Sequence, residues 1–541
     1  MNYLKLSVVA LVSILSLFTA VAQEANPFVQ FEEVEETYEL YLSKGKPRAT
    51  VTKDYLFAKN RLSPVAHMDI VFNDNIKYSY SCRSEVAVVG EEKMAYSSSI
   101  LHNDTKVRGI DFYLYNGRKK FRKYSVTYEY LDATYLTTLY LEDDYKVQHK
   151  TVKIIIPKDM PYVKVHEFFF GDSRLQGNMV DKGGKRIYTI TMTDLPASRS
   201  EKSAPASRLH RPHIVLDCAF KDHKDLYNWN RKMIDVDCTI DGIEDISSSI
   251  VKGCKTDEEK IAAIYSYVQS NIRYIAFEAG QEGFRPDRPS EILRKKYGDC
   301  KGMAILLRTL LRSQGFDARY GIIGTTERPY KISEISSVCV ANHAICVLYH
   351  KGTTYYLDAT YKNIPYNAIP GHISGKQALV EDGEECKIET VPLLEARQSV
   401  DSISCDLTLK RVEGRYKLEG IAKRQAIGDS KEMLMTYTEK SKINNREALM
   451  RDMLECLSSQ SVWCNLSEKN DKQGAVSIEG NMSNEYCVTE AEDELYIDTY
   501  MGLTYQAVQI DTFSRKYDYD LGDIGRMVRF MRVNIPSDYE I

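Results

Sequence analysis

The segment with the clearest potential for covalent chemistry is Tyr297-Gly-Asp-Cys-Lys-Gly302, just before an apolar helical pattern. Asp299 is a favourable N-cap residue, so it places Cys300 in the first turn of the following helix. The unpaired amides and the dipole at a helix N-terminus stabilise an anion, which favours the thiolate form of Cys300. The thiolate is the nucleophile, so this position suits covalent catalysis. The alternative is a buried structural cysteine near a helix start.

Two further segments supply a histidine and an aspartate that could act together. They are Asn342-His343-Ala344-Ile345 and Tyr356-Leu357-Asp358-Ala359, with a plausible hairpin turn at Lys351-Gly352 between them. That turn makes Asp358 a diagonal neighbour of His343 on one face, with Cβ atoms about 7–8 Å apart or somewhat less. A shift by two residues keeps both on that face, and only a slip by one residue separates them.

A histidine beside a carboxylate has the properties of a general base. The carboxylate of Asp358 would fix the tautomer of His343 and raise its pKa. An ordinary polar contact between strands is the alternative for this pair. Among the other histidines, we expect His210 and His213 to be solvated, and we assign no catalytic role to His350 or His372.

These residues depend on a helix and strands that the sequence also predicts. Thr256 followed by Glu259 is a capping box, and apolar residues between Ile261 and Ile272 then share one helical face. A second helix is expected from about Asp299 to Ser313, with Gly315 as its stop. Strands are expected at 318–324, 341–349 and 353–359, which gives an α+β block ending near residue 385.

The order of cysteine, histidine and aspartate, on a helix start and then two paired strands, resembles the transglutaminase-like superfamily. The resemblance rests on YGDCKGMAILLRTLLRSQGFDAR (297–319), ANHAICVL (341–348) and YYLDAT (355–360). Tyr274 and Phe284-Arg-Pro286 also resemble the segment before the cysteine in the bacterial branch. The match extends from about residue 250 to 385.

The resemblance implies papain-like chemistry without a cofactor or metal ion. Cys300 would attack an acyl carbonyl, His343 would carry the proton, and Asp358 would orient the imidazole. The oxyanion would be held by the Cys300 amide and one further donor, from Tyr297 or the 274–285 segment, and this choice stays open. The candidate oxyanion or supporting residues are Tyr297, Asp299 and Asn342.

Two positions depart from the pattern of related bacterial sequences. Gly302 stands where an acidic residue is frequent, and Ala341 stands where an aromatic residue is frequent. Neither belongs to the expected triad, so we expect both to affect the rim of the cleft rather than activity.

The sequence on both sides of this block is rich in β signals. Alternating segments from about 27 to 235 predict strands, with a hairpin turn at Asn116-Gly117 and an exposed polar loop at 196–211. From about 395 the β pattern returns, with a hairpin near Val412-Glu413-Gly414 and a helical insertion at about 444–458. The segment from Val533 to Tyr539 reads as the start of a strand, which predicts that the C-terminal domain continues beyond Ile541.

We therefore expect a multidomain α+β protein in which a papain-like core lies between two β-rich domains. The expected divisions are a signal peptide at 1–22, a β-sandwich-like N-terminal domain at 23–240, the transglutaminase-like domain at 241–390 and a β-rich C-terminal domain at 391–541. This arrangement resembles exported bacterial proteins, especially those of the Bacteroidetes.

The first 22 residues have the features of a secretory signal peptide. An apolar run from Leu6 to Phe18 follows Lys5, and Ala20-Val21-Ala22 makes a cleavage site before Gln23. The run is shorter than the roughly 20 residues that a membrane span needs. We expect a protein of the periplasm or the extracellular space, without a membrane anchor.

Composition excludes several other classes of protein. The net charge of −4 has no basic footprint for nucleic acid. The 12 cysteines include no CxxC pair, which argues against a structural zinc site. If Cys300 is free, 11 remain, so at least one more is unpaired, and any disulfide connectivity stays open.

The expected activity is hydrolysis of a peptide or amide bond in a peptide, protein or cell-wall substrate. Protein crosslinking stays open because it shares the acyl-enzyme, and so does a non-catalytic binding module that retains the fold. Arg285, Arg288 and Arg328 in the expected cleft loops would suit an acidic ligand, although solvated surface arginines explain them equally well. The substrate and the oligomeric state stay open.

Overall fold

The computed structural model describes residues 29–540 with several gaps. The gaps are 59–64, 83–86, 95–105, 114–122, 170–174, 199–200, 235–241, 277–282, 442, 455–459, 472–473, 500–509, 511–512, 514 and 523–524. The expected signal peptide and the expected turn at Asn116-Gly117 lie outside the described residues. In the part that is described, no helix has the length and apolar character needed to cross a bilayer.

The N-terminal part is built from three β-sheets. A seven-stranded sheet has the order β11-β12-β9-β1-β2-β7-β4, and two three-stranded sheets have the orders β10-β13-β8 and β3-β6-β5. The strands are β1 (Gln30–Ser43), β2 (Lys46–Phe57), β3 (Val65–Phe72), β4 (Ile76–Cys82), β5 (Ala87–Met94), β6 (Lys106–Tyr113), β7 (Lys123–Tyr130), β8 (Thr138–Tyr140), β9 (Lys146–Pro157), β10 (Lys164–Phe168), β11 (Gln176–Lys182), β12 (Lys185–Leu195) and β13 (His213–Asp217).

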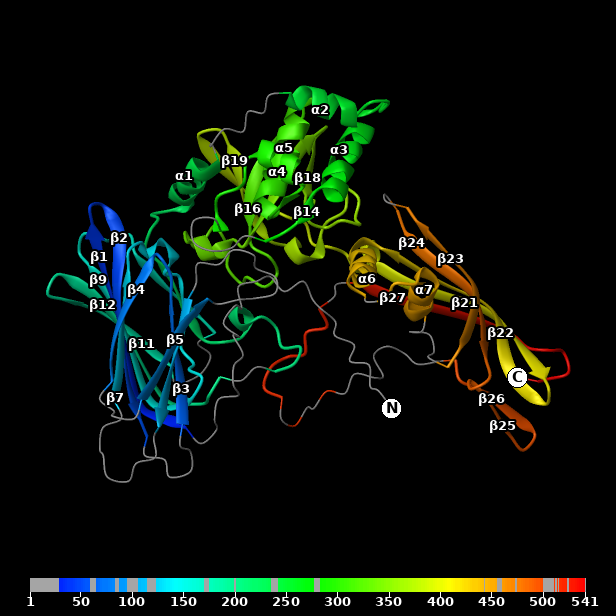
Figure 1. Cartoon of the computed structure of the whole chain (residues 1–541), viewed down its shortest axis with the longest axis horizontal. Coiled ribbons are helices and arrows are strands. Elements are labelled where there is room, and N and C mark those ends of the chain that lie inside the picture. Colours follow the sequence, from blue (N-terminus) through cyan, green and yellow to red (C-terminus); the bar gives the residue numbers. More distant parts are fainter. Residues whose placement is uncertain are drawn as a thin grey trace.

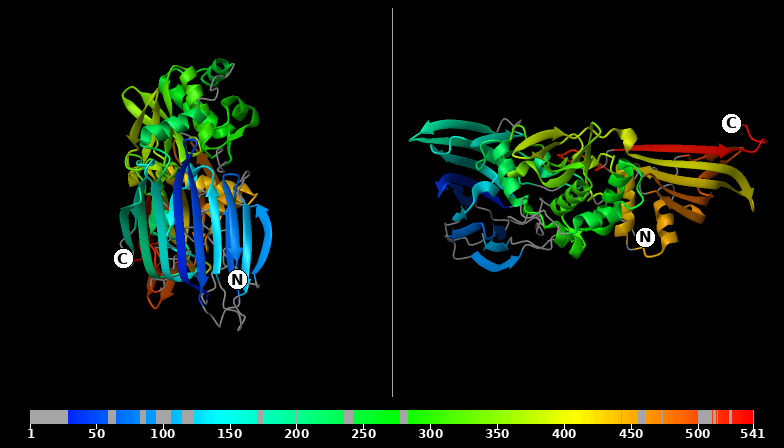
Figure 2. Two further views of the ribbon diagram at one scale, coloured as in Figure 1. Left: turned by 90° about the vertical axis from the view of Figure 1, so that its left-hand side faces the viewer. Right: turned by 90° about the horizontal axis from the view of Figure 1, so that it is seen from above.

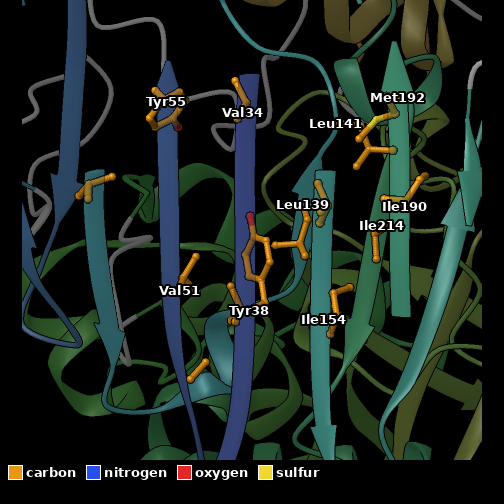
Figure 3. Close-up of a cluster of buried hydrophobic side chains, with 14 of the residues drawn as sticks. Val34, Tyr38, Val51, Tyr55, Leu139, Leu141, Ile154, Ile190, Met192 and Ile214 are labelled. Carbon is orange, nitrogen blue, oxygen red and sulfur yellow. The ribbon is translucent and has the colours of Figure 1, made fainter. Parts of the chain in front are cut away.

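One face of the large sheet packs against both small sheets. Alternate residues of a strand share a face, and in β1 these are Val34, Tyr38 and Leu40, all buried. Figure 3 shows Val34 and Tyr38 of β1 beside Ile154 of β9 and Leu139 of β8 in this core. The β-rich, sandwich-like character expected for this region is thereby confirmed.

Two expectations for the end of this region are wrong. Residues up to about 235 were expected to be β, but His223–Ile234 form helix α1, which contacts β19 and β20 of the central sheet. The polar segment 196–211, expected to be exposed, is mostly half-buried. Its Glu201 accepts hydrogen bonds from the backbone N–H groups of Lys516 and Tyr517. The segment is therefore packed against a distant part of the chain.

The central part joins helices to a five-stranded antiparallel sheet of order β18-β17-β16-β19-β20. The helices are α2 (Ile243–Ile250), α3 (Asp257–Asn271), α4 (Pro289–Lys295) and α5 (Cys300–Ser313). The strands are β16 (Asp317–Ile323), β17 (His343–His350), β18 (Thr353–Leu357), β19 (Gln377–Asp382) and β20 (Glu385–Thr390), together with the short parallel pair β14 (Arg273–Tyr274) and β15 (Tyr297–Gly298).

The local signals read from this part of the sequence are confirmed. Thr256 and Glu259 form the capping box at the start of α3. Asp299 caps α5, and Gly315, just past its end, has the left-handed φ of +84° that glycine tolerates. Helix α5 packs against β16 and β17, with α3 and α4 beside it.

The C-terminal part is a five-stranded sheet of order β23-β24-β22-β21-β27 with two helices. Its elements are β21 (Val400–Val412), β22 (Arg415–Ile427), α6 (Gly428–Lys440), α7 (Arg446–Leu454), β23 (Val462–Asn470), β24 (Val476–Asn484), β25 (Val488–Ala491), β26 (Glu494–Ile497) and β27 (Arg526–Asn534). The hairpin at Glu413-Gly414 and the helix near 444–458 are confirmed, but α6 was not expected. The expected strand start at Val533 is wrong, because β27 ends at Asn534.

Figures 1 and 2 show the central α+β part between the two β-rich parts, in the order of the chain. The expected fold class, a mixed α+β protein with β-rich flanks, is confirmed. Nine cysteines whose side chains the structure describes are free thiols.

Candidate active site

Cys300 is the first residue of α5 and is held by the cap of that helix. The carboxylate of Asp299 accepts a hydrogen bond of 2.9 Å from Gly302 N and also pairs with the buried Lys301 ammonium. Most of the following helix is buried, including Met303, Leu306 and Leu307. A buried helix in a close-packed core moves little, so the thiol has a fixed position.

The hairpin formed by β17 and β18 brings His343 and Asp358 together. His350 pairs with Thr353, as the predicted register requires, and the pairing ends at Cys346 and Leu357. Asp358 follows the last paired residue, and its Oδ2 lies 2.7 Å from Nε2 of His343. Nδ1 is then the ring atom left for Cys300, whose thiol is near enough to raise the pKa of His343.

Asp358 is nearly completely buried, with 1% of its side chain exposed, and both of its oxygens are occupied. Oδ1 accepts hydrogen bonds from the backbone N–H and the hydroxyl of Thr360, at 3.0 and 2.7 Å. The Tyr265 hydroxyl donates to the Asp358 carbonyl at 2.8 Å. Burial alone would raise the pKa of Asp358, but the two adjacent histidines and their hydrogen bonds hold this pKa well below its usual range.

The same contacts raise the pKa of the His343 imidazole. Burial lowers the pKa of His343, but the charge and the hydrogen bond of Asp358, together with the hydrogen bond of Cys300, raise it well above its ordinary value. A base with this environment holds a proton readily after taking it from a thiol. The site can therefore hold a thiolate beside an imidazolium.

His372 is a functional candidate to which the sequence reasoning gave no role. Its Nε2 lies 3.0 Å from Oδ2 of Asp358, the same oxygen that His343 contacts. The ring of Tyr361 stacks on the His372 ring with centroids 4.4 Å apart. Burial lowers the pKa of His372, although Asp358 opposes this effect, so the ring is a neutral donor to the carboxylate.

His343, Asp358 and His372 are also a possible ligand set for a metal ion. Zinc at about 2.0–2.1 Å from each ligand in a tetrahedral site would hold ligand atoms about 3.3 Å apart. The observed separations from Asp358 Oδ2 are 2.7 and 3.0 Å, which are hydrogen-bond distances. The present geometry suits hydrogen bonding better than metal coordination.

The candidate supporting residues lie around the cysteine and the histidine. Tyr297 is in β15, beside Arg273 of β14. The Asp299 carboxylate caps α5 and pairs with Lys301. The amide of Asn342 is engaged at both ends by Thr325, with bonds of 2.9 and 3.1 Å. Asn342 therefore fixes the turn before His343, while residues 277–282 of the possible oxyanion segment lie outside the described part.

The expectation that Gly302 affects the rim of the cleft is wrong. Gly302 is buried, and a Cβ atom there would lie 2.8 Å from Cδ1 of Ile292 in α4. A larger side chain at this position would require the Ile292 side chain to move. Gly302 therefore faces the packing between α4 and α5 rather than the rim of a cleft.

Three other histidines lie away from the site, and two of them are less exposed than expected. His213 is completely buried in β13, and the half-buried His210 ring contacts the Tyr517 ring at 3.9 Å between centroids. His350 lies 3.6 Å from Glu258 at the hairpin turn. Of the arginines expected in cleft loops, Arg285 and Arg288 are exposed, whereas Arg328 is buried.

A weak sequence signal existed for Thr360 but not for His372. Asp358-Ala-Thr360 is a spacing at which an aspartate side chain can accept a backbone N–H two residues on. His372 reaches Asp358 through an irregular segment between β18 and β19, whose path depends on tertiary packing. No local pattern encodes that path.

Comparison with known families agrees with this geometry. Residues 244–359 match the family model described as the transglutaminase-like superfamily, so this part of the chain is a transglutaminase-like domain. The matched region contains Cys300, His343 and Asp358. A comparison with curated proteins gives no significant match.

Two solved structures illustrate the likeness. A "putative protease" from Parabacteroides distasonis has a TM-score of 0.50 and 11% identity, and the match covers 85% of this chain and 94% of that one. A "putative cysteine protease" from Cytophaga hutchinsonii has a TM-score of 0.19 and 12% identity, covering 58% of this chain and 77% of that one. At such an identity the first match concerns the fold alone.

Proposed function

We propose that the protein is an exported cysteine hydrolase that cleaves peptide or amide bonds through Cys300, His343 and Asp358. The observation that carries this proposal is the buried 2.7 Å contact between His343 and Asp358. Cys300 supports it, because its thiol contributes to the raised pKa of the same imidazole. Export is supported by the signal-peptide pattern of residues 1–22.

The mechanism follows from the roles that the contacts allow. Cys300 passes its proton to Nδ1 of His343, and the thiolate attacks the carbonyl carbon of the substrate. Asp358 stabilises the imidazolium and holds the ring orientation. His343 then protonates the leaving amine, which gives an acyl-enzyme, and water activated by His343 releases the acid. Water is the default acceptor because the sequence has no recognisable lysine-binding site.

A peptide mixture of broad sequence, made from digested bacterial protein, tests this function. The full chain and Cys300→Ala would be incubated with the mixture, and new peptide termini would be identified by mass spectrometry. New termini produced by the wild type alone support hydrolysis. New Gln–Lys crosslinks would indicate transfer instead, and identical peptide profiles for the two proteins would contradict the proposal.

A further inference from the structure

Arg328 is a buried cation with an unpaired guanidinium nitrogen. Among the lysines and arginines that the structure describes as buried, Lys150, Lys301 and Lys431 each have oxygen partners. Arg328 has 2% of its surface exposed, and its buried Nη1 has no hydrogen-bond partner. A buried charge without a partner is costly, and proteins normally pair it or coordinate an ion with it.

A second arginine with an unpaired nitrogen, Arg208, lowers the pKa of Arg328. Arg208 lies in the short 3₁₀ helix Ser207–Leu209, and its buried Nε has no partner either. Burial, and then the charge of Arg208, lower the pKa of Arg328 to about 10. The groups that oppose this shift are Cys339, Tyr330 and Tyr140, which are neutral in their ordinary state. The surroundings of Arg328 are therefore electropositive and poorly solvated.

The neighbouring groups do not neutralise these arginines. His213 receives a hydrogen bond from the Tyr330 hydroxyl at Nε2 and donates Nδ1–H to the Arg211 carbonyl, so its ring is neutral. Burial and the charges of Arg208 and Arg211 lower the pKa of His213 to about 4. Asp217 is engaged at Oδ2 by His166 and by the backbone N–H of Ser336, and its Oδ1 is hydrogen-bonded neither to these arginines nor to any other described group.

We propose that Arg208 and Arg328 together bind an oxyanion, the carboxylate, phosphate or sulfate group of a ligand. A guanidinium offers a planar fork of N–H donors that matches such groups and retains its charge when partly buried. The anion would supply the acceptors missing at Nε of Arg208 and Nη1 of Arg328. The site lies where the segment before β13 meets the loop between β16 and β17.

This loop also connects the proposed anion site to the candidate active site. Arg328 N donates to the carbonyl of Thr325 at 2.9 Å, and Thr325 N donates to Oδ1 of Asn342, the residue before His343. Thr326 N donates to the carbonyl of His372 at 2.7 Å. An anion that orders this turn would therefore act on the backbone beside both histidines, although binding itself does not depend on the proposed function.

The test is thermal unfolding of the full chain at constant ionic strength, with chloride replaced by phosphate, sulfate or acetate. We expect at least one oxyanion to raise the Tm by about 2–5 °C near ten times its Kd. The three salts distinguish tetrahedral anions from carboxylates. Arg328→Met should lose this rise and should be at least as stable as wild type in chloride, because it removes an uncompensated charge.

Two further variants complete the experiment. Arg294→Met is the matched control, since Arg294 is 67% exposed and pairs with Glu291 on α4, and it should retain the full rise. Arg208→Met should weaken the apparent affinity for the oxyanion at least about tenfold, which tests the site even if Arg328→Met does not fold.

Two results would overturn the proposal. One is an absence of any oxyanion-specific rise in the wild type, or an equal rise in Arg328→Met. The other is a loss of stability for Arg328→Met in chloride without an anion response in the wild type. That second result would mean that Arg328 pairs inside the protein, for example with Oδ1 of Asp217, which has no partner.

Discussion

The structure contains two buried charge clusters, one in the N-terminal sandwich and one in the central domain. The first has the features of a structural ion-pair cluster, and the second has those of a catalytic site. The Glu36 cluster comprises Glu36, Lys53, Asp143 and Lys150, and the Asp358 cluster comprises Asp358, His343 and His372. In each, a carboxylate with 1–2% exposure accepts from two cationic or imidazole side chains. Both carboxylates have a pKa held below the usual range, against the effect of burial.

The two clusters differ in the side chains that pair with the buried carboxylate. Lys150 lies 2.8 Å from Glu36 and 2.7 Å from Asp143, and the surrounding charges raise its pKa despite burial, so it keeps its proton at any physiological pH. His343 can gain or lose a proton, and its second nitrogen is directed to a thiol. The lysines of the Glu36 cluster hold their protons and serve as structural partners, whereas His343 can exchange a proton with the thiol beside it.

The largest expected effect is the loss of hydrolytic activity when the Cys300 thiol is removed. Cys300→Ala removes the nucleophile, so hydrolysis should fall by at least about 10³-fold while the melting temperature stays near that of wild type. Peptide turnover and thermal unfolding measure the two quantities. Cys254→Ala, at another half-buried cysteine, is the control and should retain activity. Equal losses in both variants would mean that the assay follows folding.

Disrupting the Glu36 cluster should lower the free energy of unfolding and leave the hydrolytic activity of the folded protein unchanged. Glu36→Gln leaves Lys53 and Lys150 with an uncharged partner, and loss of a buried pair costs about 3–5 kcal/mol. Denaturant unfolding measures this loss. Because the pKa of Glu36 is lowered on folding, its contribution is present above about pH 4.3 and disappears as the pH falls toward the folded pKa.

The control for this experiment lies on the same strand. Glu39 pairs with Lys185 at 2.7 Å, but both side chains are nearly half exposed. Glu39→Gln should therefore change stability by less than about 1 kcal/mol. A similar cost for both variants would remove the distinction between the buried cluster and a surface ion pair.

Asp358→Asn tests the titratable cluster while preserving volume. The amide cannot stabilise the imidazolium and favours the wrong tautomer, so kcat/KM should fall by about 10²-fold or more. Rates at several pH values measure this effect, and the alkaline limb should move to lower pH because His343 loses its charged partner. Asp382→Asn, at an acid in β19 that pairs with Arg319, should leave the profile unchanged.

The smallest effect concerns His372 as a positioning residue. His372→Ala removes one of several donors to Asp358, and a hydrogen bond to a charged group is worth about 1.5–3 kcal/mol. If about 1.4 kcal/mol of this acts on the transition state, kcat falls roughly tenfold. His372→Gln keeps a donor and should recover part of the rate. If Ala and Gln variants match wild type in rate and pH profile, His372 has no role in orienting Asp358.

These clusters also show what the sequence could predict. The register that joins His343 to Asp358 follows from a two-residue turn, in which Lys351 and Gly352 both have positive φ. Helix α6 was missed because its buried residues include Asp429, Lys431 and Glu432, which give no apolar periodicity. His372 and the buried Arg328 depend on loop paths fixed by packing, which local patterns do not encode.

The measurement that tests the central claim most directly is the rate of alkylation of Cys300 against pH, in wild type and His343→Ala, with the modified site mapped by mass spectrometry. A thiolate–imidazolium pair predicts rapid alkylation of wild-type Cys300 at about pH 5–7, where a free thiol is protonated. His343→Ala should lose this reactivity and regain it only at alkaline pH. Identical pH profiles in the two proteins, or an inert Cys300, would contradict the account.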